Sequence, residues 1–136
     1  MNVLDLFSGI GGFSLGLERA GMRTVAFCEI DPFCRRVLAK HWPDVPCYHD
    51  VRELTGARLA ADGIGVDAIC GGFPCQDYSV AKPLNKANGL EGKKGVLWWD
   101  IHRFIEAQKP KMAILENVDR LLVSPGTQRG RDFAIM

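Results

Sequence analysis

Apolar positions along the chain fall alternately into short continuous runs and into stretches at helical spacing. The run over residues 2–6 predicts a buried strand, and the glycine-rich turn from Ser8 to Gly12 follows it. Apolar residues then recur at helical register between Phe13 and Leu17, and Gly21 is expected to end that helix. The first twenty residues therefore predict a strand, a tight turn and a helix.

The same succession repeats along the rest of the chain. Residues 24–28 are apolar and partly β-branched, which predicts a second strand, and Asp31-Pro32 has the residue types of an N-cap and a first helical turn. Gly71-Gly72 is expected to break the fourth strand. Further strands are expected at 46–48, 66–70 and 112–115, and further helices at 96–108 and 127–136.

Strands that alternate with helices indicate right-handed βαβ crossovers. The sequence therefore predicts an α/β fold with a Rossmann-like, doubly wound and mostly parallel sheet. Ligands of open α/β sheets bind beyond the carboxyl ends of the strands. We expect one crevice there, lined by the glycine turn, Glu29, Asp50, Cys75 and Glu116, because each of these follows a predicted strand directly.

Composition adds limits on the class of protein. The 136 residues, 47% hydrophobic and 24% charged, suit one soluble domain, and a net charge of +1 gives no basic field of the kind that grips nucleic acid. The five cysteines are odd in number and form no CxxC pair, which argues against a disulfide framework and a zinc site and is typical of a reducing cytoplasm. No stretch is long and apolar enough for a signal peptide or membrane span, so no membrane partner is expected.

The turn and Glu29 have the arrangement of a nucleoside-cofactor site. An acid about twenty residues after a glycine turn can accept hydrogen bonds from ribose hydroxyls, and Gly9 and Glu29 have that separation. The turn does not read G-x-G-x-x-G, and a purely structural turn is the alternative. Asp50, after a third strand, favours a ligand.

Cys75 and Glu116 are candidates for the reactive groups. Cys75 follows Pro74 in a turn that leaves a strand, where a thiol can ionise, whereas the other cysteines lie in apolar runs or ordinary element positions. Glu116 ends a wholly apolar strand, where desolvation would favour the protonated acid. A cap or an ordinary ion pair is the alternative for this carboxylate.

Three motifs, in order and spacing, resemble the DNA cytosine-5 methyltransferase family. The motifs are DLFSGIGGF at 5–13, GFPCQ at 72–76 and ENV at 116–118. The resemblance covers essentially the whole chain, including the segment 95–100 and the tail 128–133. It implies S-adenosylmethionine as cofactor, with Glu29 on the ribose, Asp50 near the adenine amine and Pro74 at the reactive end. The full set implied around the cofactor is Phe7, Gly9, Ile10, Gly11, Gly12, Glu29, Ile30, Asp50, Val51, Pro74 and Leu97.

The resemblance also implies the reaction. The Cys75 thiolate would add to C6 of a flipped-out cytosine while Glu116 binds the ring near N3, so that C5 accepts the methyl group. Residues 76–95 resemble the mobile catalytic loop of the family. The residues implied at the DNA are Gln76, Ser79, Asn117 and Val118, with phosphate contacts from Lys82, Lys86, Lys93 and Lys94.

Two positions depart from the family pattern. Ile30 stands where many relatives have an aromatic residue that stacks on adenine, so we expect apolar packing there and weaker cofactor binding. Asp77-Tyr78 departs from the residues common in the loop.

The resemblance further implies that residues 1–136 form the N-terminal part of the catalytic domain. The resemblance implies an Arg-x-Arg motif, a target-recognition region and a final helix after the tail at 128–136, and none of these follows that tail in the given sequence. We therefore expect the chain alone to be inactive or nearly so, and to expose apolar faces and a sheet edge that favour aggregation. The implied partners are double-stranded DNA with a flipped cytosine and, for a split enzyme, a second chain that supplies the target-recognition region.

Three alternatives remain open from the sequence. An RNA cytosine-5 methyltransferase would share the fold and motifs. A non-catalytic fragment, either one subunit of a split enzyme or a decayed remnant, belongs to a different class. A nicotinamide-dependent oxidoreductase would explain the glycine turn and Glu29 but leaves Cys75 and Glu116 without a role.

Overall fold

A computed structural model of the protein describes residues 1–73, 97–117, 119–123 and 128–136. The chain divides into two compact units. The first contains Met1–Gly72 and Asp100–Leu115, and the second contains Phe73–Trp99 and Glu116–Met136. Each unit is described separately below.

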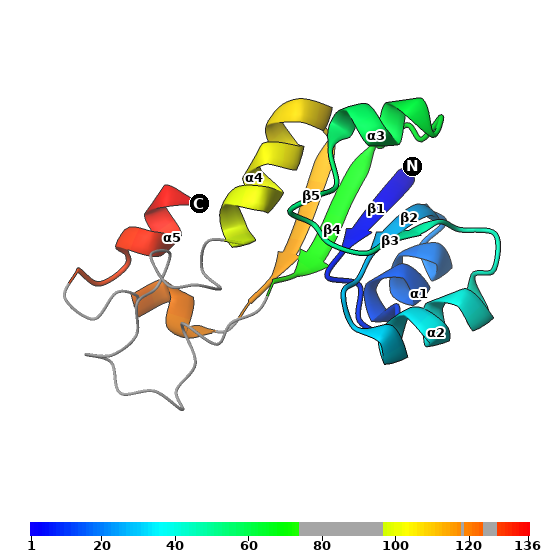
Figure 1. The fold of residues 1–136 in the computed structure, drawn as a ribbon. Helices are drawn as coiled ribbons and strands as arrows, with labels where there is room; N and C mark the ends of the chain where they lie inside the picture. Colours follow the sequence, from blue (N-terminus) through cyan, green and yellow to red (C-terminus); the bar gives the residue numbers. More distant parts are fainter. Residues whose placement is uncertain (74–96, 118, 124–127) are drawn as a thin grey trace. The chain divides into compact units, whose positions relative to one another are not determined.

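The first unit is built on a five-stranded sheet, as the sequence predicts. Its strand order is β3-β2-β1-β4-β5, which Figure 1 shows from one side of the sheet to the other, and β1 pairs in parallel with both β2 and β4. The strands are β1 (Asn2–Leu6), β2 (Arg23–Cys28), β3 (Cys47–Tyr48), β4 (Ala68–Gly72) and β5 (Met112–Glu116). From β1 the chain adds β2 and β3 on one side of the sheet and then β4 and β5 on the other side. Open α/β sheets bind ligands at such a change of direction.

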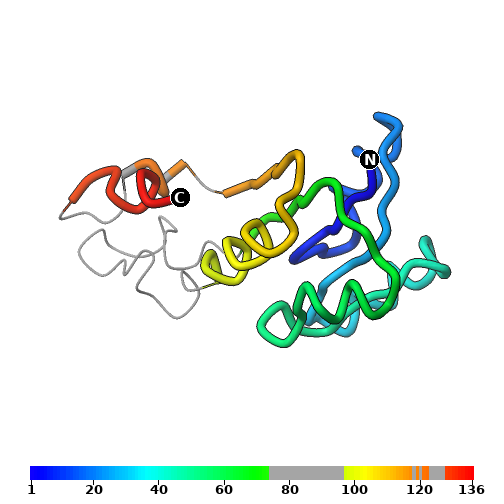
Figure 2. Tube along the Cα trace, turned by 90° about the horizontal axis from the view of Figure 1, so that it is seen from above, coloured from blue at the N-terminus to red at the C-terminus, as the bar shows by residue number. Residues whose placement is uncertain are grey.

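Four helices connect these strands. They are α1 (Gly12–Arg19), α2 (Pro32–His41), α3 (Gly56–Ala61) and α4 (Leu97–Gln108). Right-handed crossovers place α1 and α2 on one face of the sheet and α3 and α4 on the other, because the chain moves from β1 to β3 in one direction and from β3 to β5 in the opposite one. The α3 and α4 helices lie next to each other in Figures 1 and 2.

Side-chain hydrogen bonds join the helices within each pair. On one face, the Trp42 indole N–H donates to Glu18 of α1 at 2.9 Å. On the other, Arg103 of α4 donates to the carbonyl oxygens of Leu54 at 3.0 Å and Val51 at 2.8 Å, just before α3. The bonds from Arg103 hold the connection from β3 to α3, which contains Asp50 and Val51.

The predicted start of α2 is confirmed. Asp31 is the N-cap, and its Oδ1 accepts hydrogen bonds from the backbone N–H groups of Phe33 at 2.8 Å and Cys34 at 2.9 Å, while Pro32 occupies the first turn. The bond from Cys34 is the largest cause of a lowered pKa of the Asp31 carboxyl.

The fourth strand differs from the prediction. Gly71 and Gly72 continue β4 instead of breaking it, and Gly71 pairs with Leu6. A Cβ on Gly71 would lie 2.4 Å from the Leu6 carbonyl oxygen, so only glycine lets these two strands approach here. The glycine therefore permits close strand pairing.

Two other element predictions also need correction. The sequence pattern does not reveal α3, a six-residue helix capped by Thr55, whose Oγ1 accepts from the Arg58 N–H at 3.1 Å. The last helix was expected over 127–136, but α5 spans only Arg131–Ile135, because Gly130 at its N-cap has a φ of 82°. The expected loop at 77–95 lies outside the described residues.

The described part of the second unit contains a short 3-10 helix, η3 (Asp119–Val123), and α5. The rings of Phe73 and Trp98, both nearly fully buried, pack with their centroids 6.1 Å apart. Within the described ranges of the chain, none of the helices has the length and apolarity needed to cross a bilayer.

Candidate functional site

The turn after β1 has an unusual backbone. Phe7 has a φ of 54°, and Gly9 and Gly11 have φ values of 55° and 89°, so three residues within five adopt left-handed conformations. Such conformations cost free energy in a residue with a side chain and often occur at ligand sites. Phe7, which the family resemblance implies at the cofactor, has this strained backbone and is half-buried.

Hydrogen bonds hold the turn in place. The Ser8 hydroxyl donates to the Asp5 carbonyl at 2.6 Å, and the Ser8 N–H donates to the Cys28 carbonyl at 3.3 Å. The Gly11 N–H in turn donates to the Ser8 carbonyl at 2.9 Å. Ser8 thus fixes the turn to the ends of both β1 and β2.

Glu29 is brought to the turn, as its spacing from Gly9 predicts. Its Oε2 accepts from the Gly9 N–H at 2.7 Å, and its Oε1 accepts from the Asp31 N–H at 2.8 Å. Each carboxylate oxygen can accept a second hydrogen bond. Glu29 therefore joins the turn to the start of α2 and keeps acceptor capacity for a ligand hydroxyl.

Space and apolar surface are available beside the turn. No atom of the described residues, near chain neighbours aside, lies within 4 Å of a Cβ built on Gly9 or Gly12. The side chains of Ile10 and Ile30 are 60% and 54% exposed, which is high for isoleucine. The turn thus presents open backbone between two exposed apolar side chains.

Asp5 is a residue of this region that sequence reasoning missed. Its carboxylate is fully buried, and its Oδ2 accepts from the Ser14 hydroxyl at 2.6 Å in the first turn of α1. Among the described residues no hydrogen-bond donor is placed for its Oδ1. Burial raises the pKa of Asp5 to about 6, although the Ser14 bond and the nearby Cys70 thiol offset part of this shift. The available signal was a carboxylate inside an apolar strand.

Asp50 lies after β3 and is already paired. Its Oδ1 accepts hydrogen bonds from the backbone N–H of Arg52 and from the Nε of the same residue, both at 2.9 Å. Hydrogen bonding to the Arg52 side chain is the largest cause of the lowered pKa of the Asp50 carboxyl. Val51, expected at the cofactor, has its side chain in the core at 5% exposure. Its carbonyl is also occupied by Arg103. The side chain of Val51 thus packs in the core, and its carbonyl already accepts a hydrogen bond.

The predicted reactive residues belong to the second unit. Cys75 and its neighbours Pro74, Gln76 and Ser79 lie outside the described residues, as does Val118. Glu116 is exposed, so the burial expected at the end of β5 is not found. In the same unit, the Asn117 side-chain amide donates to the Phe73 carbonyl at 3.3 Å, and Leu97 is half-buried.

Two of the described cysteines, Cys28 and Cys70, are buried. Burial raises the pKa of Cys28 to about 12 and raises that of Cys70 further above the ordinary range. No disulfide joins the four cysteines of the described ranges, and no group of three metal-ligating side chains occurs there. The expectation that Cys28 and Cys70 are structural agrees with these environments.

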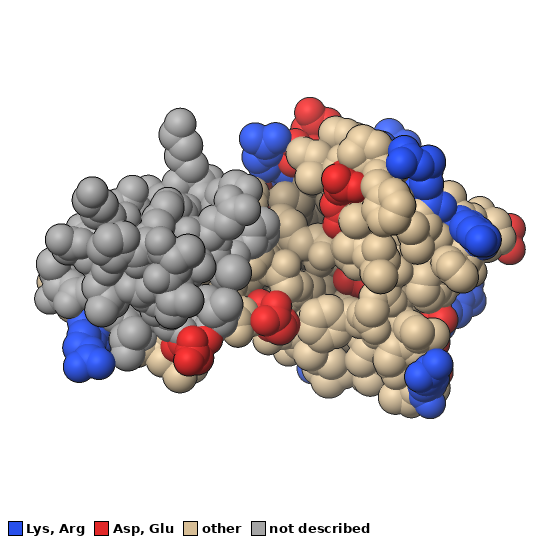
Figure 3. All heavy atoms as spheres, turned by 90° about the horizontal axis from the view of Figure 1, so that it is seen from below, with Lys and Arg blue, Asp and Glu red and all other residues tan. Residues whose placement is uncertain are grey.

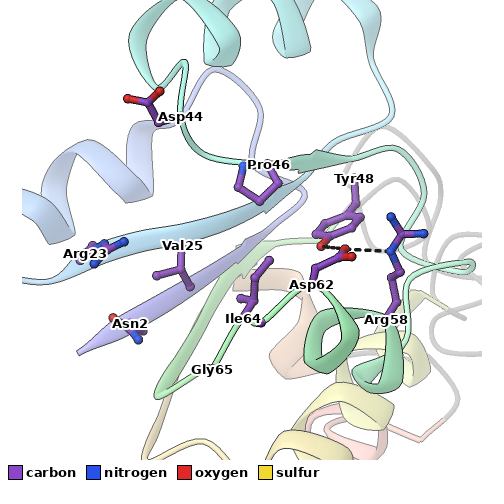
Figure 4. A pocket seen from close by; sticks show the side chains of 11 residues that line it. Asn2, Arg23, Val25, Asp44, Pro46, Tyr48, Arg58, Asp62, Ile64 and Gly65 are labelled. Atoms are coloured by element: carbon purple, nitrogen blue, oxygen red, sulfur yellow. Dashed lines mark hydrogen bonds and ion pairs between the residues drawn. The ribbon is translucent and has the colours of Figure 1, made fainter.

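In the described part of the chain, we also considered surface charges and a pocket away from the turn as signs of a second cofactor site. Figure 3 shows Lys and Arg interspersed with Asp and Glu over the described part of one face. An open pocket of about 610 Å³ lies beside the amino ends of β1 and β2, where Tyr48 and Arg58 both bond to Asp62 (Figure 4). None of the predicted cofactor residues lines this pocket.

The first unit is thus an open parallel α/β domain with a glycine turn and an acid joined at the carboxyl ends of β1 and β2. The family model for C-5 cytosine-specific DNA methylase matches residues 1–135. The chain belongs to this family.

Individual relatives agree with that assignment. The chain is 44% identical to the type II methyltransferase M.Sau3AI of Staphylococcus aureus over 100% of this chain and 35% of that protein. It is 38% identical to M.HgiBI of Herpetosiphon aurantiacus over 88% of this chain and 26% of that protein. A crystal structure of a candidate DNA modification methyltransferase encoded within a prophage (E. coli) superposes with a TM-score of 0.75 at 28% identity, over 91% of this chain and 34% of that one. The chain spans between about a quarter and about a third of the length of these proteins.

Proposed function

We propose that this chain carries the cofactor-binding and reactive part of a DNA (cytosine-5) methyltransferase that uses S-adenosylmethionine. The observation that carries the proposal is family membership over residues 1–135, which include the three motifs. The similarity to type II methyltransferases extends the proposal to the DNA methylation of a restriction-modification system.

The residues of the turn fit such a donor. The open space at Gly9 and Gly12 admits a ligand close to the backbone, and Glu29 has acceptor capacity for ribose hydroxyls. Ile10 and Ile30 offer exposed apolar surface for a flat base. For Asp50 to receive the adenine amine, it must share oxygens that Arg52 already contacts.

Further residues are assigned to the same ligand by family membership. Phe7, Gly11, Val51, Pro74 and Leu97 complete the proposed surroundings of the cofactor. When bound, S-adenosylmethionine supplies a methyl group on a positively charged sulfur. The chain's own part is to hold the donor at the strand ends and to activate the base.

Cys75 and Glu116 are proposed to activate the cytosine. Addition of the Cys75 thiolate to C6 forms a carbon–sulfur bond and moves an electron pair toward C5, while Glu116 binds the ring near N3. C5 then has the electron density needed to accept a methyl group, which the aromatic ring lacks. Removal of the C5 proton by a base expels the thiolate and restores the ring.

Double-stranded DNA with a flipped-out cytosine is the proposed substrate. Gln76, Ser79, Asn117 and Val118 are assigned to the DNA side by their motifs. We also propose that a target-recognition region, on this protein or on a second chain, is needed for activity, because sequence is read through base edges in the grooves. We expect the protein to act in the cytoplasm, where that DNA would be found.

Two measurements test the proposal. Isothermal titration of the chain with S-adenosylhomocysteine and with NAD should give binding of the former alone, and binding of NAD alone would contradict the proposal. When the target-recognition region is supplied, transfer of a labelled methyl group should favour DNA over transfer RNA. A preference for RNA would assign the same reaction to another substrate, and binding without any transfer would support a non-catalytic fragment.

A further inference from the structure

The glycine turn needs support from outside its own backbone. Gly9 and Gly11 have φ values of 55° and 89°, and glycine restrains its own backbone least of all residues. A ligand site built on this turn therefore requires a neighbour that limits the movement of its backbone. That neighbour is found at the end of α2.

Trp42, the C-cap residue of α2, packs directly against Gly11. A Cβ on Gly11 would lie 2.6 Å from Cζ3 and 2.7 Å from Cη2 of the Trp42 ring, and 3.1 Å from a methyl of Leu38. Gly11 itself is buried. The six-membered part of the indole thus fills the space beneath the turn and leaves no room for a side chain there.

The Trp42 ring is itself fixed from two directions. Its indole N–H donates to Oε1 and Oε2 of Glu18 at 2.9 and 3.0 Å, and this part-buried bond to a carboxylate is of the stronger kind. Its ring also meets Phe27 of β2 edge-on, with centroids 5.4 Å apart. Glu18 belongs to α1, the helix that begins directly after the turn. Trp42 therefore connects α1 and β2 beside the turn.

We propose that Trp42 is a positioning residue for cofactor binding: its ring supports Gly11 from below, and Glu18 holds the ring in that position. The inference rests on the proposed function of the turn. It assigns no contact between Trp42 and the ligand. Loss of the ring frees Gly11 and shifts the turn together with the Glu29 carboxylate that is bonded to Gly9. A small displacement of a binding group can cost a large factor in affinity.

The test compares the affinity of the chain for S-adenosylhomocysteine among variants by isothermal titration. Trp42→Leu should weaken binding by about tenfold to a hundredfold. Glu18→Gln keeps an oxygen acceptor and should bind nearly as the unchanged chain does, whereas Glu18→Ala should be several times weaker. Leu59→Ala, at a fully buried position of α3, is the matched control for lost packing and should keep its affinity.

A pair of substitutions separates support of the turn from ordinary helix packing. Gly11→Ala alone should nearly abolish binding, since its methyl group meets the indole. Trp42→Phe lacks the ring atoms that this methyl group meets, so the double variant Gly11→Ala with Trp42→Phe should bind several times more tightly than Gly11→Ala alone. The rescue should be partial, because a φ of 89° remains strained for alanine.

The outcomes distinguish this inference from the proposed function. If the unchanged chain does not bind S-adenosylhomocysteine, the proposed function is overturned and this inference with it. If the chain binds and Trp42→Leu binds equally well, or if Leu59→Ala loses as much affinity, the inference alone is overturned. Hydrogen exchange of the Gly11 amide gives a readout without ligand: it should accelerate in Trp42→Leu, and unchanged exchange would also contradict the support of the turn.

Discussion

Gly9 and Glu29, twenty residues apart, are joined by a hydrogen bond in which the Gly9 N–H donates to Glu29 Oε2 at 2.7 Å. The same carboxylate accepts from Asp31 at the start of α2. Glu29 thus stabilises the turn in addition to its proposed part in ribose binding. Its removal should affect both.

Glu29→Ala removes the acceptor for two backbone N–H groups, and we expect its affinity for S-adenosylhomocysteine to fall by about tenfold or more. Glu29→Gln presents an oxygen to only one of the two N–H groups and should be intermediate. Isothermal titration measures both. Glu106→Ala, which changes a glutamate on α4 with a 73% exposed side chain, is the control and should bind unchanged. Equal affinity of Glu29→Ala and the control would contradict the assigned role.

The buried Asp5 predicts a pH dependence of stability. Its folded-state pKa of about 6 lies above the ordinary 3.8, so between these values the folded protein retains a proton that the unfolded chain releases. The contribution of Asp5 to the free energy of unfolding therefore falls as the pH rises through that window. Once the pH exceeds the folded-state pKa, the loss reaches up to about 3 kcal/mol.

Asp5→Asn removes this titration. The free energy of unfolding of the variant minus that of the unchanged chain should be larger at pH 7.5 than at pH 4.5, as measured by urea denaturation. The subtraction cancels the contributions of the titratable groups that both chains share. A difference that does not vary with pH would show that Asp5 is not the buried acid described above.

Gly71 is required for the pairing of β4 with β1. Gly71→Ala should lower the free energy of unfolding by about 3 kcal/mol or more, because its methyl group would meet the Leu6 carbonyl oxygen. Gly16→Ala is the matched control, at an exposed position of α1. No atom beyond its own helix backbone and chain neighbours lies within 4 Å of the new Cβ. That change should stabilise the chain by about 0.5–1 kcal/mol. Similar effects of the two changes would contradict the strand contact.

The proposed nucleophile predicts opposite outcomes for two cysteines. Where methyl transfer to DNA is measured, Cys75→Ser should lower the rate by a factor of about 10³ or more, because the attacking thiolate is lost. Cys28→Ser should retain transfer, although a hydroxyl in this buried position lowers stability. If both variants behave alike, the assignment of Cys75 is wrong.

The strand-end residues were predictable because they depend on local patterns. Apolar runs indicate the strands, although β4 continues two residues beyond its expected end, and the parallel arrangement then brings the turn and Glu29 to one edge. The six-residue α3 was not predictable in this way, since it is too short to show a period. Its Thr55 cap was the available signal.

Contacts between distant side chains were not predictable. Val51 turned out to be a core residue, because packing decides which side of a connection faces inward. The links from Asp5 to Ser14 and from Trp42 to Gly11 join residues on separate elements. A linear pattern shows which residue types are present but not which of them meet.

Among the five described strands, β1 is synthesised first and lies in the middle of the sheet. Its pairing with β4 joins residues about 65 positions apart, and the backbone N–H of Asn2 donates to the Asp67 carboxylate at 2.9 Å. A nascent chain must therefore keep β1 open on one side until residue 72 has left the ribosome. Such distant contacts slow folding, so we expect early fragments to depend on chaperones or partners until the central strand is enclosed.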